Sequence, residues 1–427
     1  MKMLLPRATS ACLLSLAMLA PVVHARDEEA GNALSLQRAI TAALQGNPAL
    51  QSFEFQFRAQ DARAQQAGLR PATELSLDVE NFAGSGDLKG FDAAEATFAL
   101  SQVIELGDKR DARIGAAQAG RSALDIERQA AQLDVLAEVT RRFIAVAQRQ
   151  QQVRLASDAV GLAEKTVEAS ERRVNAAKSP HAELDRARIA FDRAKLDERA
   201  TLADLDVARK QLAASWGESQ PVIDGQPFGE VRADLFALPT AGDFPALAER
   251  LVNNPDFLRY ASEARLRDAE LRLASSLSRP DFTVSAGVRR FEEAKDQAFV
   301  ASLAVPLFSG RRAEGFVAEA RANRELVDVE RRAAEVKAQA TLYELHRQLI
   351  RAVSEATTLR DDIKPRSAEA LNETEYAYER GRYSYLELVD AQREFLAVQA
   401  ALIDAAASAH GLRAEIERLT NAPLATP

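Results

Sequence analysis

The sequence is poor in cysteine, glycine, proline and aromatic residues. Its one cysteine, Cys12, lies near the amino terminus, so the chain that follows has no disulfide, thiolate nucleophile or cysteine-based metal site. Only 19 of the 427 residues are glycine, 15 are proline, and aromatic residues make up 6%. This scarcity, together with abundant Ala, Leu, Arg, Glu and Gln, favours long helices over a β-sandwich or a disordered chain.

Signals for nucleic-acid binding and for catalysis are missing as well. The formal net charge is −8 and no basic tract occurs, so we expect no nucleic-acid partner. The sequence contains no phosphate-binding loop of the GxxxxGK[ST] type and no recognisable pairing of a nucleophile with a base. His181, His346 and His410 are widely separated along the chain. We therefore expect no metal site, no cofactor and no enzymatic activity.

The amino-terminal residues 1–25 are typical of a secretory signal peptide. Lys2 and Arg7 precede an apolar stretch, and small residues stand at the cleavage positions that end at Ala25. No later segment approaches the roughly 20 apolar residues of a membrane-spanning helix. We therefore expect an exported protein without spanning helices.

A repeat with a period of about 200 residues organises the rest of the chain. Gly46-Asn47-Pro48 is matched by Asn253-Asn254-Pro255, and Leu69-Arg70-Pro71 is matched by Ser278-Arg279-Pro280. Glycine and proline are concentrated between the two halves, as in a linker. The expected divisions are a signal peptide (1–25), a first repeat (26–216), a linker or equatorial segment (217–243), a second repeat (244–421) and a C-terminal tail (422–427).

The positions of proline leave room for very long helices in each repeat. No proline lies between Pro71 and Pro180, so residues 109–177 can form one helix of about 69 residues, about 100 Å long. A return helix fits residues 181–215. In the second repeat, two segments follow the alternating 3-4 spacing of coiled-coil seams. The seam residues are Leu326, Val329, Ala333, Val336, Ala340 and Tyr343 in one segment, and Leu388, Ala391, Phe395, Val398, Leu402, Ala405, Ala409, Leu412, Ile416 and Leu419 in the other.

Four shorter segments alternate apolar and polar residues, as strands with two different faces do. We expect them at about residues 72–82, 94–105, 281–290 and 297–307, arranged as two hairpins. Each has the length of about 9–11 residues that a transmembrane strand needs. Four strands are too few to close a barrel and an open edge is unstable in lipid, so closure requires other copies of the chain. The alternative is a pair of solvent-exposed hairpins on a soluble protein.

Together these features resemble the TolC-like outer-membrane factor family over nearly all of the chain after the signal peptide. The features are the two tandem repeats, the strand hairpin flanked by very long helices in each, and the central segment rich in glycine and proline. Three short stretches resemble the CzcC-like subgroup, which serves heavy-metal resistance systems. These stretches are Gln66-Ala67-Gly68-Leu69-Arg70-Pro71, Glu80-Asn81-Phe82-Ala83-Gly84-Ser85-Gly86 and Ser101-Gln102-Val103-Ile104-Glu105-Leu106-Gly107-Asp108-Lys109-Arg110.

The resemblance implies a mainly α fold with a β-barrel contribution. A homotrimer would form a 12-stranded barrel in outer-membrane lipid and a 12-helix tunnel through the periplasm. It would work with a periplasmic adaptor (membrane fusion protein) and an inner-membrane pump of the resistance-nodulation-division (RND) type. We therefore expect the exit duct of a tripartite efflux system for divalent heavy-metal cations. Two alternatives stay open: the same duct for drugs, organic solutes or type I protein secretion, and a soluble periplasmic coiled-coil scaffold.

The resemblance also implies that the adaptor docks where one long helix turns into the next. Gly381 fits the family's tip glycine, whereas Ala177 replaces it in the first repeat. From the residues alone, Ser179 fits an N-cap before Pro180, and Ser384 with Glu387 fits a capping box. The docking candidates are Ala177, Lys178, Ser179 and Pro180 in the first turn, and Gly381, Arg382, Tyr383 and Ser384 in the second.

Acidic residues just beyond these turns resemble those that line the family's narrowed periplasmic entrance. Glu387 and Asp390 are three positions apart on one helix face, and Glu183 and Asp185 form a looser pair in the first repeat. In three copies they would form a ring of carboxylates that repel one another and attract cations. The simpler explanation is that Glu387 only caps its helix and Asp390 is only solvated.

Overall fold

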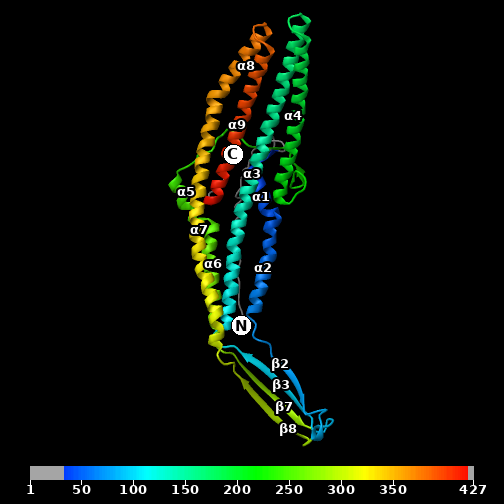
Figure 1. Cartoon of the computed structure of the whole chain (residues 1–427), viewed down its shortest axis with the longest axis vertical. Helices are drawn as coiled ribbons and strands as arrows, with labels where there is room; N and C mark the ends of the chain where they lie inside the picture. The colour runs from blue at the N-terminus through cyan, green and yellow to red at the C-terminus, as the bar shows by residue number, and fades with distance from the viewer. Residues whose placement is uncertain (1–32, 422–427) are drawn as a thin grey trace, which may run out of the picture.

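The molecule is elongated, with a small β-sheet at one end and long helices leading away from it (Figure 1). This computed structural model describes residues 33–421. The expected signal peptide and C-terminal tail, with Cys12, lie outside the described residues. From the sheet, the chain twice runs along a long helix to a turn at the opposite end and then comes back.

The first passage ends at Trp216 and contains the longest helix, α3, which has 67 residues. α3 begins at Lys109, where the sequence predicts a long helix to begin. The elements of this passage are β1 (Ala33–Leu34), α1 (Leu36–Gly46), α2 (Pro48–Ala67), β2 (Glu74–Glu80), η1 (Gly86–Leu88), β3 (Glu95–Ile104), α3 (Lys109–Asn175), α4 (His181–Ala213) and η2 (Ala214–Trp216).

The second passage follows the same plan, but its long helix is interrupted. A π-helical turn, Leu359–Ile363, separates α7 from α8, and Pro365 lies in the first turn of α8. The elements are α5 (Phe244–Arg250), η3 (Leu251–Asn253), α6 (Pro255–Ser276), β7 (Phe282–Phe291), β8 (Asp296–Ala304), α7 (Ser309–Thr358), α8 (Lys364–Glu379) and α9 (Tyr385–Thr420). Between the passages lie the short strands β4 (Val222–Ile223), β5 (Gln226–Pro227) and β6 (Glu230–Val231).

Two asparagines show why the repeated Asn-Pro pairs recur. Asn47 caps α2 by accepting hydrogen bonds from backbone amides, and its Nδ2 donates to the carbonyl oxygen of Ser215 at 2.8 Å. Asn254 caps α6 in the same way and donates to the carbonyl oxygen of Arg418 at 2.7 Å. Each side chain therefore joins the start of one helix to the last turn of the repeat's final helical segment, where carbonyl groups lack helical partners.

The sheet has the order β2-β3-β7-β8, and all its pairs are antiparallel. Leu77 is paired with Phe98, Phe98 with Val288 and Val288 with Phe299, which forms a row of apolar side chains across one face. Phe299 is 93% exposed. On the opposite face of the sheet, Arg289 forms ion pairs with Glu80 and Glu95. In the described chain, β2 and β8 have no strand on their outer edges.

The helices lie side by side and are crossed by residues 217–243, which we call the strap. Apolar residues of the strap pack with α1 and α3 in the largest core cluster. Side chains of the second repeat hold the strap through its carbonyl oxygens. His410 and His346 donate from Nε2 to Leu235 and Gly242, both at 3.1 Å, and Arg360 of the π-helix donates to Phe236 at 3.0 Å.

Two of the short stretches that resemble the CzcC-like subgroup meet where the sheet joins the helices. Arg113 forms a bidentate ion pair with Glu105 and donates to the carbonyl oxygens of Ala67 and Leu69. Arg110 donates to the carbonyl oxygen of Gly68 at 2.6 Å. The arginines therefore satisfy the carbonyl groups at the C-terminal end of α2, which have no helical partners.

Helix α9 corrects the expectation that no later segment is apolar enough to span a membrane. By length and composition, α9 passes that test, with a mean hydropathy of 1.3 over its most apolar window. It also packs against α3, α7 and α8, and its predicted seam residues Leu402, Ala405 and Ala409 are buried in the chain's cores. The alanine-rich run in α9 is therefore explained by close helix packing.

Candidate functional site at the helix-turn tip

The two helix turns lie together at the end of the molecule remote from the sheet, and we call them the tip (Figure 1). Each turn contains one residue with left-handed backbone, Ala177 with φ 54° and Gly381 with φ 71°. In each turn the following amide donates to a carbonyl five residues back, Lys178 to Arg173 at 2.8 Å and Arg382 to Ala377 at 2.9 Å. The two turns therefore share the Schellman geometry, which glycine adopts without the strain of a Cβ atom.

The predicted capping box is confirmed in the second turn. Ser384 accepts a hydrogen bond from the amide of Glu387, and the Glu387 carboxylate accepts one from the amide of Ser384 at 2.6 Å. This backbone hydrogen bond lowers the pKa of the Glu387 carboxyl below its ordinary value. The charged form of Glu387 is therefore favoured at the beginning of α9.

The predicted N-cap in the first turn is wrong. α4 begins at His181 with Pro180 in the capping position, and no side chain caps it. Ser179 instead accepts a hydrogen bond from Nε of Arg173 at 2.8 Å and donates to Glu183 at 3.2 Å. The hydroxyl thus links two charged side chains of the tip.

A buried cluster joins the two turns, and we call it the latch. Tyr378 of α8 donates from its hydroxyl to Glu183 of α4 at 2.6 Å, and the same hydroxyl lies 2.8 Å from Ser170 of α3. Arg173 lies over the Tyr378 ring, donates to the Tyr378 carbonyl oxygen at 2.6 Å and pairs with Glu183 at 3.6 Å. Burial and the hydrogen bond with Glu183 raise the pKa of Tyr378 to about 12.

The predicted acidic residues differ in solvent exposure, because only Glu183 belongs to the latch. The Glu183 side chain is 14% exposed and engaged by Tyr378, Ser179 and Arg173. Asp390 is 77% exposed and lies 4.0 Å from Arg393. Glu387 and Asp185 are also exposed. The two predicted pairs are therefore unequal, since only Glu387 and Asp390 both present carboxylates to solvent.

The docking candidates form an exposed surface around the latch. Ala177, Lys178 and Pro180 are exposed in the first turn, where Ser179 is half-buried. Gly381, Arg382, Tyr383 and Ser384 are all exposed in the second turn. The sequence did not single out Arg173, Ser170 or Tyr378, because these latch residues meet partners about 200 positions away and carry no local motif.

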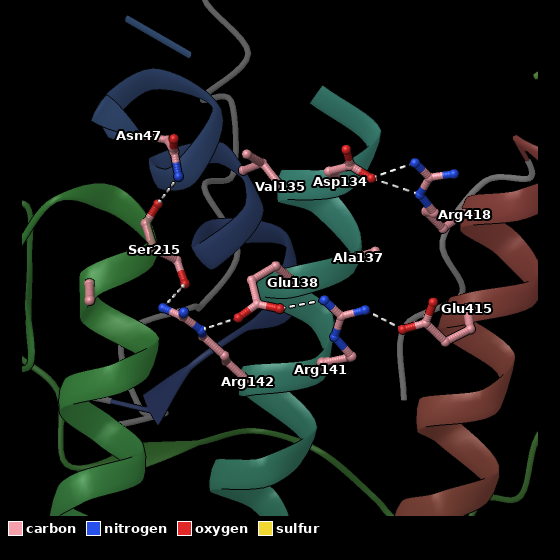
Figure 2. Close-up of a pocket in the computed structure, with 11 residues that line it drawn as sticks. Asn47, Asp134, Val135, Ala137, Glu138, Arg141, Arg142, Ser215, Glu415 and Arg418 are labelled. Carbon is pink, nitrogen blue, oxygen red and sulfur yellow. Dashed lines mark hydrogen bonds and ion pairs between the residues drawn. The ribbon is translucent and has the colours of Figure 1, made fainter. Parts of the chain in front are cut away.

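A second polar region lies on α3 between the ends of the two repeats, and Figure 2 shows the side chains that line it. It is a cleft of about 590 Å³ with Glu138, Arg141, Arg142, Glu415 and Arg418 among its lining residues. Arg141 bridges Glu138 and Glu415, and Arg142 also pairs with Glu138. These charged side chains satisfy one another and join α3 to α9. We therefore call Glu138, Arg141, Arg142 and Glu415 the clamp between the repeats.

Most of this clamp lies on a different face of α3 from the residues under the strap. Val139, Phe143 and Val146 belong to the core that the strap covers. Glu138 and Arg141, which line the cleft, are more than about 100° around the helix from the centre of that face at 3.6 residues per turn. Among residues 33–421, no group of three or more His, Cys, Asp or Glu side chains is placed to hold a metal ion.

The fold and the paired repeats define an outer-membrane efflux protein. The family described as "Outer membrane efflux protein" matches residues 39–218 and 246–422, and the chain belongs to it. The protein therefore resides in the outer membrane, and its helices extend into the periplasm.

Among proteins of known role, the chain is similar to two from Cupriavidus metallidurans. It is 29% identical to the cobalt-zinc-cadmium resistance protein CzcC over 365 residues, which cover 86% of this chain and 84% of CzcC. It is 27% identical to the nickel and cobalt resistance protein CnrC over 254 residues, which cover 59% of this chain and 58% of CnrC. Among solved structures, the outer-membrane channel OprN superposes with a TM-score of 0.74 at 16% identity, covering 91% of this chain and 90% of OprN.

Proposed function

We propose that the protein is the outer-membrane exit duct of a tripartite efflux system that exports divalent metal cations. The observation that carries the proposal is the open sheet β2-β3-β7-β8, which has one apolar face and two edges without partners in the described chain. Such an edge is stable in lipid only if another strand pairs with it. Three copies joined edge to edge supply twelve strands, an even number as in outer-membrane barrels.

The cargo is proposed from the relatives and from the charge at the tip. CzcC and CnrC are both named for resistance to divalent metals. In a trimer, Glu387 and Asp390 form a ring of six carboxylates at the periplasmic entrance, whereas Glu183 stays within the latch and Asp185 lies outside it. Carboxylates held close together attract divalent cations and select against anions.

The partners are proposed from the position of the tip. The exposed turn residues around Lys178 and Arg382 lie at the end of the molecule farthest from the sheet, where a periplasmic adaptor can reach them. The adaptor connects the trimer to an RND pump in the inner membrane. The pump supplies the energy and the duct is a passive conduit.

Growth of a deletion strain tests this function. The strain is grown with and without a plasmid copy of the gene, on zinc, cadmium, cobalt, nickel and copper, and on dyes and bile salts. Sensitivity that is confined to divalent metals and reversed by the plasmid supports metal export. Sensitivity confined to organic compounds would be consistent with an exit duct but would contradict metal cations as its cargo.

A carbonate wash of the membranes tests the location independently of cargo. An integral barrel stays in the membrane until detergent is added, whereas a soluble periplasmic scaffold is released by the wash. Release would overturn the duct itself.

A further inference from the structure

The polar face of the sheet, opposite the apolar row, carries almost only negative charge. Its residues alternate with those of the apolar face along each strand. The carboxylates on this face are Glu74, Asp78, Glu80, Glu95 and Asp296. Among the described strand residues of the same face, Arg289 is the only lysine or arginine. In the proposed duct this face lines the lumen of the barrel, so the cargo passes Arg289 on its way out.

Two of these carboxylates stand directly opposite each other. Glu80, the last residue of β2, is paired with Glu95, the first residue of β3. Side chains at such positions have Cβ atoms about 4.5–5.5 Å apart, so two negative charges there repel each other. The other three carboxylates are each opposite an uncharged residue. These pairs are Glu74 with Ser101, Asp78 with Thr97 and Asp296 with Phe291.

Arg289 neutralises the one opposed pair. Its Nη2 lies 3.1 Å from Glu80, and its Nη1 lies 2.9 Å from Glu95. Its Nε donates to the hydroxyl of Thr97 at 2.8 Å, which fixes the plane of the guanidinium. The second carboxylate oxygen of Glu95 accepts a hydrogen bond from Asn81 at 3.0 Å. Among the described strands, the only opposed carboxylates of this face therefore surround its only cation.

Without Arg289, the same oxygen atoms would be free to hold a divalent cation. Carboxylate and hydroxyl oxygens are ligands for such cations, and exposed sites of this kind reach dissociation constants of about 10⁻⁴–10⁻³ M. The site would lie at the end of the sheet remote from the helices, which is the exit of the proposed duct (Figure 1). A cation held there would obstruct those that follow, because conduction requires binding that is weak enough to release the ion.

We infer that Arg289 is the fixed counter-ion of the exit and keeps exported divalent cations from being held by Glu80 and Glu95. This inference rests on the proposed metal-exporting duct and names the residue that lets the cargo leave it. The remaining carboxylates keep the lumen attractive to cations, and none of them forms an opposed pair. Arginine suits this role better than lysine, because its planar fork contacts two carboxylates at once and is always charged.

A purely structural role for Arg289 predicts a different outcome. Arg289 also ties β2 and β3 to β7. If it did no more than that, its replacement would give a less stable barrel whose response to divalent cations is unchanged. The counter-ion role instead predicts that the replaced barrel becomes sensitive to divalent cations.

Zinc block of single channels tests the inference. The full-length protein is inserted into planar lipid bilayers in potassium chloride, and zinc chloride is added on the side of the β2–β3 loop. Arg289→Gln should be blocked at a zinc concentration about tenfold lower than the wild type, because a positive charge about 4 Å away repels a divalent cation by more than this factor even in water. Adding Glu95→Gln to Arg289→Gln should restore the wild-type response, because one of the two carboxylates is then neutral.

The matched control is Arg290→Gln, which removes the same charge from the neighbouring position of β7. Arg290 lies on the apolar face and pairs with Glu292 at 3.0 Å, so we expect the wild-type response to zinc. Arg289→Lys should give an intermediate response, since one ammonium group cannot reproduce the fork that contacts both carboxylates. If Arg289→Gln does not insert into the bilayer, Arg289→Lys decides the test, and a wild-type response in that variant overturns the inference.

The outcomes separate this inference from the proposed function. Equal zinc responses of the wild type and Arg289→Gln overturn the counter-ion role and leave the duct intact, and a reduced amount of trimer would then assign Arg289 to bracing the strands. Equal block of Arg289→Gln and Arg290→Gln also overturns it, because the effect would not depend on the opposed carboxylates. Wild-type protein that forms no channel overturns the duct and this inference together.

Discussion

Replacing Leu77 by arginine tests whether the apolar face of the sheet meets lipid. Leu77 is the central residue of β2 and begins the apolar row that continues through Phe98 and Val288 to Phe299. An arginine on the lipid face costs roughly 2–4 kcal/mol at the middle of the membrane. A trimer carries three such charges at distant positions, so its assembly in the membrane is weakened by roughly 6–12 kcal/mol.

The measurement is the amount of trimer in isolated outer membranes, separated on a gel without heating. The matched control is Ser76→Arg, because Ser76 is next to Leu77 but lies on the opposite face, where it donates to Asp78. We expect the trimer to be lost in Leu77→Arg and kept in Ser76→Arg. Normal trimer in Leu77→Arg would show that this face does not contact lipid. Loss in Ser76→Arg alone would show that the two faces are reversed.

Three further predictions concern the latch, the strap and the sheet. Tyr378→Phe removes the hydroxyl that donates to Glu183, and a hydrogen bond to a charged group is worth about 1.5–3 kcal/mol. We therefore expect faster amide hydrogen exchange at both turns. Unchanged exchange would show that the latch does not hold the turns together. Burial lowers the pKa of His410 below 6.5, so the folded protein keeps it neutral and loses stability as the pH falls below about 6.5. The variant His410→Gln keeps a hydrogen-bond donor for the strap but cannot be protonated. Between about pH 7.5 and about pH 5.5, the melting temperature of this variant should fall less than that of the wild type. Equal falls in melting temperature would contradict the prediction. Gly287→Val should reduce folded protein in the outer membrane, because a Cβ atom there would lie 2.2 Å from a carbonyl oxygen of β3; Ser285→Val, on the same face, is the control.

The architecture could be predicted wherever its signal is local. Heptad spacing and the absence of proline predict α3 and α9, and two-residue alternation predicts the strands that became β2, β3, β7 and β8. The capping box at Ser384 was predictable because its two partners are three residues apart. The N-cap at Ser179 was predicted wrongly because Arg173 and Glu183 compete for its hydroxyl. A charge-assisted hydrogen bond is stronger than one to a neutral amide, so the local rule failed there.

The candidate site shows where local reasoning ends. Glu183 and Glu387 have the same chemistry and both follow a helix turn, yet one is enclosed by Tyr378 and Arg173 while the other faces solvent. Apart from Ser179, the partners of Glu183 come from α3 and α8, so the residues near it in the chain do not indicate that it is enclosed. Likewise, the heptads of α7 and α9 look alike in sequence, and only the structure shows that the α9 seam residues are buried or half-buried while the α7 seam residues are exposed.

The sequence by itself determined the elements of this protein and their repetition, since helix and strand periods, turns and caps depend on residues close together in the chain. Tertiary structure alone decided which seams meet within one chain, which face outward, and which charged groups are enclosed. The physical reason is that burial and ion pairing depend on distances between α3, α4, α8 and α9, which are remote in sequence and are placed by the packing of the whole layer.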